Sequence, residues 1–152
     1  MYKIQQHTGA VVCGLIPDGM QQITFLRDQA ANQRWVFETE MPTRRLVSAL
    51  SDENQLRTQK DGRRPTGVGL LVIGYDRSGP HLFETLPNAQ CNEYIAHAIG
   101  SRSQSALTYL EKNQEMLATL QTPEDIIIAL LRSVKFAHES ELTAEMIAVA
   151  IV

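Results

Sequence analysis

Features that would indicate a membrane, nucleic-acid-binding or secreted protein are scarce in this sequence of 152 residues. Its longest apolar runs, such as residues 67–74, are far too short to cross a bilayer. The first residues contain no hydrophobic signal core. The formal net charge is -3, whereas surfaces that bind nucleic acids or membranes usually carry a basic stripe. We therefore expect a cytoplasmic and nuclear protein that binds neither nucleic acid nor membrane.

Cysteine and metal-ligand patterns are scarce as well. Cys13 and Cys91 are the two cysteines, and neither belongs to a CxxC pair, which favours reduced, partly buried thiols over a disulfide. The histidines lack the spacing of metal ligands, so we expect surface or hydrogen-bonded histidines, no metal and no cofactor. The four histidines are His7, His81, His97 and His138.

Six segments are typical of β-strands because they are short, apolar and bounded by turn residues. The run Gly67–Asp76 is almost continuously apolar, which predicts a strand covered on both faces. A turn is expected at Thr8-Gly9, between the first two strands. The predicted strands are Lys3–Gln6, Ala10–Leu15, Gly67–Asp76, His81–Leu86, Gln90–Ile99 and Met146–Val152.

Four segments have apolar residues at helical spacing. They are predicted to run from Asp18 to Arg34, from Pro42 to Gln59, from Ser103 to Leu117, and onward from Thr122, which can cap Pro123-Glu124-Asp125. Trp35-Val36-Phe37 is expected to stop the first of them. The expected buried stripes are Met20, Ile23, Leu26 and Ala30; Leu46, Ala49, Leu50 and Leu56; Ala106, Tyr109, Leu110 and Leu117; and Ile127, Leu130, Leu131 and Val134.

The order of these segments is β-β-α-α-β-β-β-α-α-β, in which helix pairs separate groups of antiparallel strands. This order predicts an α+β layered sandwich in a single domain, residues 1–152. The last strand, Met146–Val152, has no partner after it, so we expect both ends of a larger domain to be missing. The isolated chain is then expected to be poorly stable or self-associated, since one strand cannot cover a sheet.

Several constellations could carry chemistry, but each has a plainer interpretation. Ser101, Ser103 and Ser105 beside Arg102 lack a GxSxG elbow and are more typical of helix caps than of a nucleophile. Gly67-x-Gly69 precedes a strand instead of following one into a helix, which argues against a phosphate loop. The pairs Arg44-Arg45 and Arg63-Arg64 are interpreted as solvated faces or contacts between subunits. The residues alone indicate no active site.

The run Arg64–Asp76 (RPTGVGLLVIGYD) nevertheless closely resembles the central motif of proteasome alpha-type subunits. It is followed in register by Gly79-Pro80-His81-Leu82-Phe83 and Pro87, then by residues 98–106 and 108–111. Lys3-Ile4 and Cys13-Gly14-Leu15 match the strands before the first long helix of the family, and residues 147–152 match its late strand. The resemblance covers essentially the whole chain.

The resemblance implies an αββα sandwich of the N-terminal-nucleophile hydrolase type, incomplete at both ends. It implies a non-catalytic structural subunit of the core alpha ring that supports assembly, substrate gating and the docking of regulatory particles in ubiquitin-dependent degradation. Implied partners are other alpha subunits, beta subunits and a regulatory particle or activator. Lys3 matches the lysine that receives the carboxyl terminus of an activator, and the helices from Asp18 to Arg34 and from Pro42 to Gln59 would contact the beta ring.

Two departures and two alternatives accompany this interpretation. Thr66 stands where the family usually has a large apolar or aromatic residue, and Met20 where it usually has arginine. One alternative is a catalytic beta-type subunit, but that class uses an amino-terminal Thr, Ser or Cys and this chain begins Met1-Tyr2. The other alternative is a truncated fragment that does not assemble.

Overall fold

The computed structural model describes residues 1–120, 122–138 and 142–152. The chain divides into two compact units, residues 1–95 together with Val152, and residues 96–151. The single domain expected from the sequence stays a prediction. Within the described ranges, no helix is both long enough and apolar enough to span a membrane.

The first unit contains a five-stranded antiparallel sheet in the order β1-β2-β3-β4-β5, which confirms the expected meander. At its centre Val72 lies opposite Ala10 on one side and Phe83 on the other, and all three are buried. The strands are β1 (Tyr2–Gln5), β2 (Thr8–Gly14), β3 (Val68–Asp76), β4 (Gly79–Thr85) and β5 (Cys91–Glu93).

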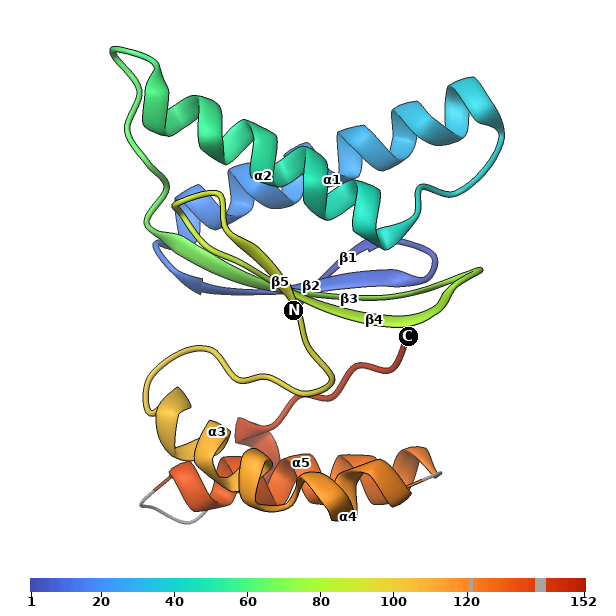
Figure 1. Ribbon diagram of the computed structural model, residues 1–152, viewed down its shortest axis with the longest axis vertical. Coiled ribbons are helices and arrows are strands. Elements are labelled where there is room, and N and C mark those ends of the chain that lie inside the picture. The colour runs from blue at the N-terminus through green and yellow to red at the C-terminus, as the bar shows by residue number, and fades with distance from the viewer. Residues whose placement is uncertain (121, 139–141) are drawn as a thin grey trace. The chain divides into compact units, whose positions relative to one another are not determined.

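Helices α1 (Ile16–Phe37) and α2 (Thr43–Gln59) lie across one face of this sheet (Figure 1). The core forms where their apolar stripes meet the inward residues of β2, β3 and β4. Ile23, Leu26, Leu46 and Leu50 are fully buried, as expected. An α+β layer of two helices on an antiparallel sheet is therefore present.

The second unit is helical and contains α3 (Ser103–Lys112), α4 (Gln114–Thr119), α5 (Pro123–Ala137) and a short 3₁₀ turn, η1 (Ala144–Met146). Helices α3 and α5 pack together, with the rings of Tyr109 and Phe136 5.5 Å apart. Thr122 caps α5 as predicted, because its hydroxyl accepts a hydrogen bond from the amide of Asp125 at 3.2 Å.

Two predicted strands are wrong in extent. The third strand of the meander covers only Cys91–Glu93 instead of Gln90–Ile99, and Ile95, just beyond it, is 93% exposed. Residues 147–152 are not a strand but irregular chain after η1. A strand requires a neighbour for its amides and carbonyls, and within the described residues no ladder includes 147–152.

The β1–β2 turn lies at Gln6-His7 rather than Thr8-Gly9, because Gln5 pairs with Thr8 after a register shift.

Three helix predictions also need correction. Trp35–Phe37 does not stop α1 but forms its last residues, and the helix ends at Glu38 in a left-handed conformation. The segment Ser103–Leu117 is broken at Asn113, whose side-chain amide donates to the carbonyl of Tyr109 at 2.8 Å. The predicted serine cap of α3 is wrong as well, since Arg102 occupies the N-cap position.

The apolar stripes were predicted correctly at the centres of α1 and α2 and less well elsewhere. Met20 and Leu56 are 38% and 39% exposed. Leu56 lies near the end of α2, whereas Met20 lies beside the buried face of α1, which includes Gly19 and Ile23. On α5, Ala129 and Ser133 are the buried residues, whereas Leu130 and Val134 are exposed. Strand β3 alternates buried and partly exposed positions up to Gly74, so the expected complete cover of both faces is not seen.

Candidate functional site

Lys3, the one residue for which the resemblance implies a ligand role, lies exposed in edge strand β1 opposite Gly9. Its neighbours Tyr2 and Ile4 pack against the core, so alternation along the strand directs the lysine side chain away from that core. Its carbonyl oxygen accepts a hydrogen bond from Nε of Arg27 at 2.9 Å. The backbone of Lys3 is thus tied to α1 while its ammonium group stays accessible.

The start of the Arg64–Asp76 motif is held by one buried carboxylate. Asp18, 4% exposed in the first turn of α1, accepts two hydrogen bonds from the guanidinium of Arg64 at 2.6 and 2.7 Å. It also accepts the amide of Gly67 at 3.0 Å. These bonds lower the pKa of Asp18 to about 2, with the Arg64 hydrogen bonds as the main cause. Arg64 is thus solvated as predicted, since its side chain is 66% exposed, but it also binds within the chain, which the sequence did not indicate.

Thr66, one of the departures from the family pattern, joins a second buried polar cluster. Its hydroxyl accepts a hydrogen bond from Nε2 of Gln22 at 2.9 Å, and the same amide nitrogen donates to Oδ1 of Asn54 at 2.9 Å. All three residues are at most 4% exposed. A threonine at this position is thus accommodated by polar partners from α1 and α2. The other departure, Met20, is exposed.

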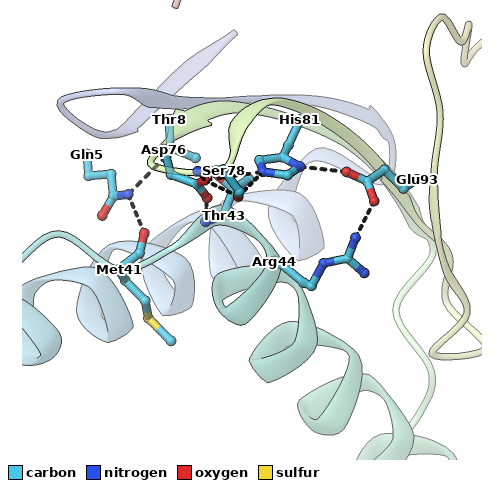
Figure 2. Close-up of polar contacts among 9 residues, drawn as sticks. All are labelled: Gln5, Thr8, Met41, Thr43, Arg44, Asp76, Ser78, His81 and Glu93. Atoms are coloured by element: carbon cyan, nitrogen blue, oxygen red, sulfur yellow. Dashed lines mark hydrogen bonds and ion pairs between the residues drawn. The ribbon is translucent and has the colours of Figure 1, made fainter.

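The largest charged cluster lies where the β3–β4 turn, β5 and the start of α2 meet (Figure 2). Nδ1 of His81 lies 2.5 Å from Oε1 of Glu93, and its Nε2 lies 2.8 Å from Oγ of Ser78 and 3.2 Å from Oδ1 of Asp76. Arg44 pairs with the other oxygen of Glu93, and its guanidinium lies over the ring of Phe83, 5.4 Å from the centroid.

Asp76 also fixes two backbone segments in this cluster. Its Oδ2 accepts the amide of Thr43, in the first turn of α2, at 3.1 Å, and its Oδ1 accepts the amide of Ser78 at 2.9 Å. The pKa of Asp76 is lowered to about 2, chiefly by the hydrogen bond from the Ser78 hydroxyl. An aspartate at the end of the family motif is thus used to cap the following turn and the start of α2.

Ser78, His81 and Glu93 superficially resemble a serine–histidine–acid catalytic triad. The hydroxyl of Ser78, however, donates to Oδ1 of Asp76 at 2.5 Å, and the pKa of His81 is raised, chiefly by Glu93. Because its hydrogen is bound to Asp76, the Ser78 hydroxyl does not present a proton to Nε2 of His81, and that transfer is the step a triad needs. The arrangement therefore acts as a structural bridge between β3, β4, β5 and α2.

A groove opens beside this cluster, at the end of the sheet. Its lining comes from the β1–β2 turn, the α1–α2 connection and the β3–β4 turn, and includes His7, Glu40, Arg45, Tyr75 and Arg77. The groove is lined by both acidic and basic side chains. Within the described residues, no group of three or more His, Cys, Asp or Glu side chains could hold a metal ion.

Sequence reasoning placed some of these residues correctly and missed the clusters. Gly67 was expected at the start of a strand and lies there, and Cys13 and Cys91 are free thiols. Arg44 and Arg63 were expected to be solvated or intersubunit, and their side chains are 68% and 50% exposed; in addition, Arg44 pairs with Glu93 and Arg63 lies 3.6 Å from Glu53. The His81 cluster joins residues up to 49 positions apart. Its only local signal is the Asp76-x-Ser78 spacing, which is typical of an Asx turn.

Comparison with known proteins gives a consistent picture. The family model described as "Proteasome subunit" matches residues 1–152. The probable proteasome subunit alpha type-6 of Schizosaccharomyces pombe is 38% identical over all of this chain and 56% of its own length. The alpha type-1 subunit of Dictyostelium discoideum is 40% identical over 89% of this chain and 54% of its own length. The alpha type-1 subunit of Caenorhabditis elegans is 35% identical over all of this chain and 59% of its own length.

These relatives are named alpha type-1 or alpha type-6 subunits, in agreement with the alpha-type resemblance of residues 98–106 and 108–111. The chain spans somewhat more than half the length of each. The family match covers every residue of the chain, including the Asp18–Arg64 and His81 clusters. This chain belongs to the proteasome subunit family, and its relatives within that family are alpha-type subunits.

Proposed function

We propose that the protein is a non-catalytic structural subunit of the alpha ring of the proteasome core particle. The observation that carries the proposal is the match of the complete chain to alpha-type relatives. In this role the protein supports ring assembly, substrate gating and regulatory-particle docking in ubiquitin-dependent protein degradation, in cytoplasm and nucleus. Its partners are other alpha subunits, beta subunits and an activator.

The absence of catalysis is part of this proposal. Catalysis on this fold uses an amino-terminal Thr, Ser or Cys as nucleophile, and in the triad-like Ser78–His81–Glu93 arrangement the serine hydroxyl donates to Asp76 instead of to the histidine. A purified preparation should hydrolyse no peptide reporter. Hydrolysis that is blocked by a threonine-directed inhibitor, and lost when the protein is depleted, would contradict this part of the proposal.

We further propose that the ammonium group of Lys3 receives the terminal carboxylate of an activator. Its exposure and the anchoring of its backbone by Arg27 support this role, because a flexible cation on a fixed strand suits capture of a terminal carboxylate. Lys3→Ala should weaken activator binding by assembled particles, whereas Lys60→Ala, which removes an exposed lysine at the end of α2, should not. Equal affinity of the Lys3→Ala and wild-type particles would reject the role.

The helix pair α1–α2 is proposed to contact the beta ring through its polar face. Arg27 and Arg44 already bind within the chain, so exposed Asp28 and Arg45 are left to supply rim contacts. Cross-linking mass spectrometry of intact particles should join residues of α1 and α2 to beta subunits. Cross-links from these helices to alpha subunits alone would argue against this orientation.

A further inference from the structure

We infer that His81 is a proton-operated latch, which holds the β3–β4 turn to β5 tightly while its imidazole is doubly protonated and less tightly when one proton leaves. This inference concerns a conformational device and goes beyond the proposed ring function. It rests on the hydrogen bonds at the two ring nitrogens (Figure 2).

Hydrogen-bond acceptors face both ring nitrogens, which favours a doubly protonated imidazole. The Ser78 hydroxyl donates its single hydrogen to Asp76, so it accepts from Nε2 of His81, 2.8 Å away. At the other nitrogen, an ionised Glu93 carboxylate is an acceptor only, and Nδ1 donates to it across 2.5 Å. A neutral imidazole has one N–H group. With that proton on Nδ1 it keeps the bond to Glu93, but it loses the positive charge that attracts Glu93 and Asp76, and its Nε2 turns a lone pair toward Ser78 and Asp76.

The charges around the ring come from every element packed against it. Asp76 faces it from the end of β3, Glu93 from β5, and the cation Arg44 from α2 through Glu93. The aromatic ring of Phe83 stacks on the imidazole at 5.8 Å. The side chain of His81 is only 11% exposed, so water screens these charges little. The two carboxylates outweigh the one cation, and the pKa of His81 is raised above its ordinary value of 6.5.

Strand β5 is the element whose attachment the latch would weaken. It pairs with β4 over only three positions, from Phe83↔Glu93 to Thr85↔Cys91, and one further bond runs from the Tyr94 amide to the Leu82 carbonyl. A raised pKa of His81 means that the stabilisation is fully present below the ordinary histidine value. It is lost as pH rises through the higher value in the folded protein. Weaker attachment of β5 is therefore expected above the ordinary histidine value.

Hydrogen–deuterium exchange of the full-length protein, corrected for the intrinsic exchange rate at each pH, tests the latch between about pH 6 and about pH 9, a range that spans the ordinary and a raised histidine pKa. Protection of residues 91–94 should fall as pH rises from the ordinary histidine value, by at most about tenfold for each pH unit, and should level off above the raised value of the folded protein, because the two states differ by one bound proton only in between. In His81→Gln, protection should be low and independent of pH. The matched control His7→Gln, on the exposed β1–β2 turn, should follow the wild type.

A second variant keeps the inference testable if His81→Gln does not fold. Glu93→Gln removes one carboxylate charge from the ring, so the midpoint of the wild-type transition should move to lower pH. Wild-type protection that stays constant across the range would overturn the latch. So would a Glu93→Gln profile with an unmoved midpoint, or a His81→Gln profile identical to that of the wild type.

Discussion

Gly74 in β3 shows how closely one residue can fix the approach of a helix to the sheet. A Cβ built at this position would lie 2.1 Å from Oγ1 of Thr43, and Thr43, in the first turn of α2, is itself fully buried. Two atoms at that separation overlap, so α2 or β3 would have to move. Gly69, on the same strand, would meet its nearest neighbour at an ordinary 3.6 Å.

Gly74→Ala should therefore destabilise the protein by about 1–3 kcal/mol, the usual cost of overpacking a filled core. Gly69→Ala adds the same methyl group to the same strand without the overlap and should change the free energy of unfolding little. Denaturant unfolding of both variants measures the difference. If the two substitutions have equal effects, close contact between Gly74 and Thr43 does not govern the packing of α2.

The bonds from Arg64 and Gly67 to Asp18 make the stability of the protein depend on pH in the acid range. Its pKa is lowered from 3.8 to about 2, so the carboxylate contributes stability above its ordinary value, and this contribution is lost as pH falls toward 2. The melting temperature of Asp18→Asn should lie below that of the wild type at neutral pH. This difference in melting temperature should become smaller on acidification. Asp28→Asn, at an exposed position of the same helix, should melt as the wild type does. A difference that stays constant down to acid pH would contradict this assignment.

At the scale of the element, α2 illustrates how burial varies along one helix. Leu50 is fully buried against the sheet, whereas Leu56, near the end of the helix, is 39% exposed. The sequence places both on one apolar stripe, because helical spacing reports which way a residue faces and not how far the sheet extends beneath it.

Leu50→Ala should cost about 2–5 kcal/mol, since it removes buried methyl groups and leaves a cavity. Leu56→Ala makes the same change at a partly exposed site. It should lower the free energy of unfolding by no more than about 1 kcal/mol, as is usual away from the core. Thermal or denaturant unfolding of the two variants provides the comparison. Similar losses at both positions would mean that the packing under the end of α2 is tighter than the structure has it.

The elements that sequence reasoning predicted well are those governed by local pattern. The apolar stripe of α1, the strand Val68–Asp76 and the Thr122 cap each follow from periodicity or from a known capping preference. The segment Gln90–Ile99 was predicted as a longer strand, but its pairing with β4 stops after the bond from the Tyr94 amide to the Leu82 carbonyl. Such a limit is set by a neighbour distant in sequence.

In the candidate site, too, local sequence patterns were predictable and contacts between distant residues were not. The Arg64–Asp76 motif was recognisable as a run of letters, and its first and last residues turn out to bind Asp18 and cap α2. The partners themselves were not predictable, because Asp18 lies 46 positions from Arg64 and His81 lies 12 from Glu93. Both pairings exist only once the sheet and helices have formed.

At the scale of the whole molecule, the family match and the folded clusters support one account. Arg64 and Asp76, the ends of the motif that resembles the family, tie α1 and α2 to the sheet. Under the proposed function, exposed positions such as Lys3, Asp28 and Arg45 would contact neighbouring subunits, and the triad-like cluster would have a structural role. The protein would then act through the particle it joins and not through chemistry of its own.

The central claim is membership of the alpha ring, and native mass spectrometry of the affinity-tagged protein isolated from its own cells tests it most directly. The account predicts that the protein is released from a particle that contains other alpha subunits and beta subunits, and that gentle dissociation gives subcomplexes in which it is paired with alpha neighbours. Recovery of the protein only as a free chain, as oligomers of itself, or in subcomplexes with beta subunits in a beta-ring position would contradict the account.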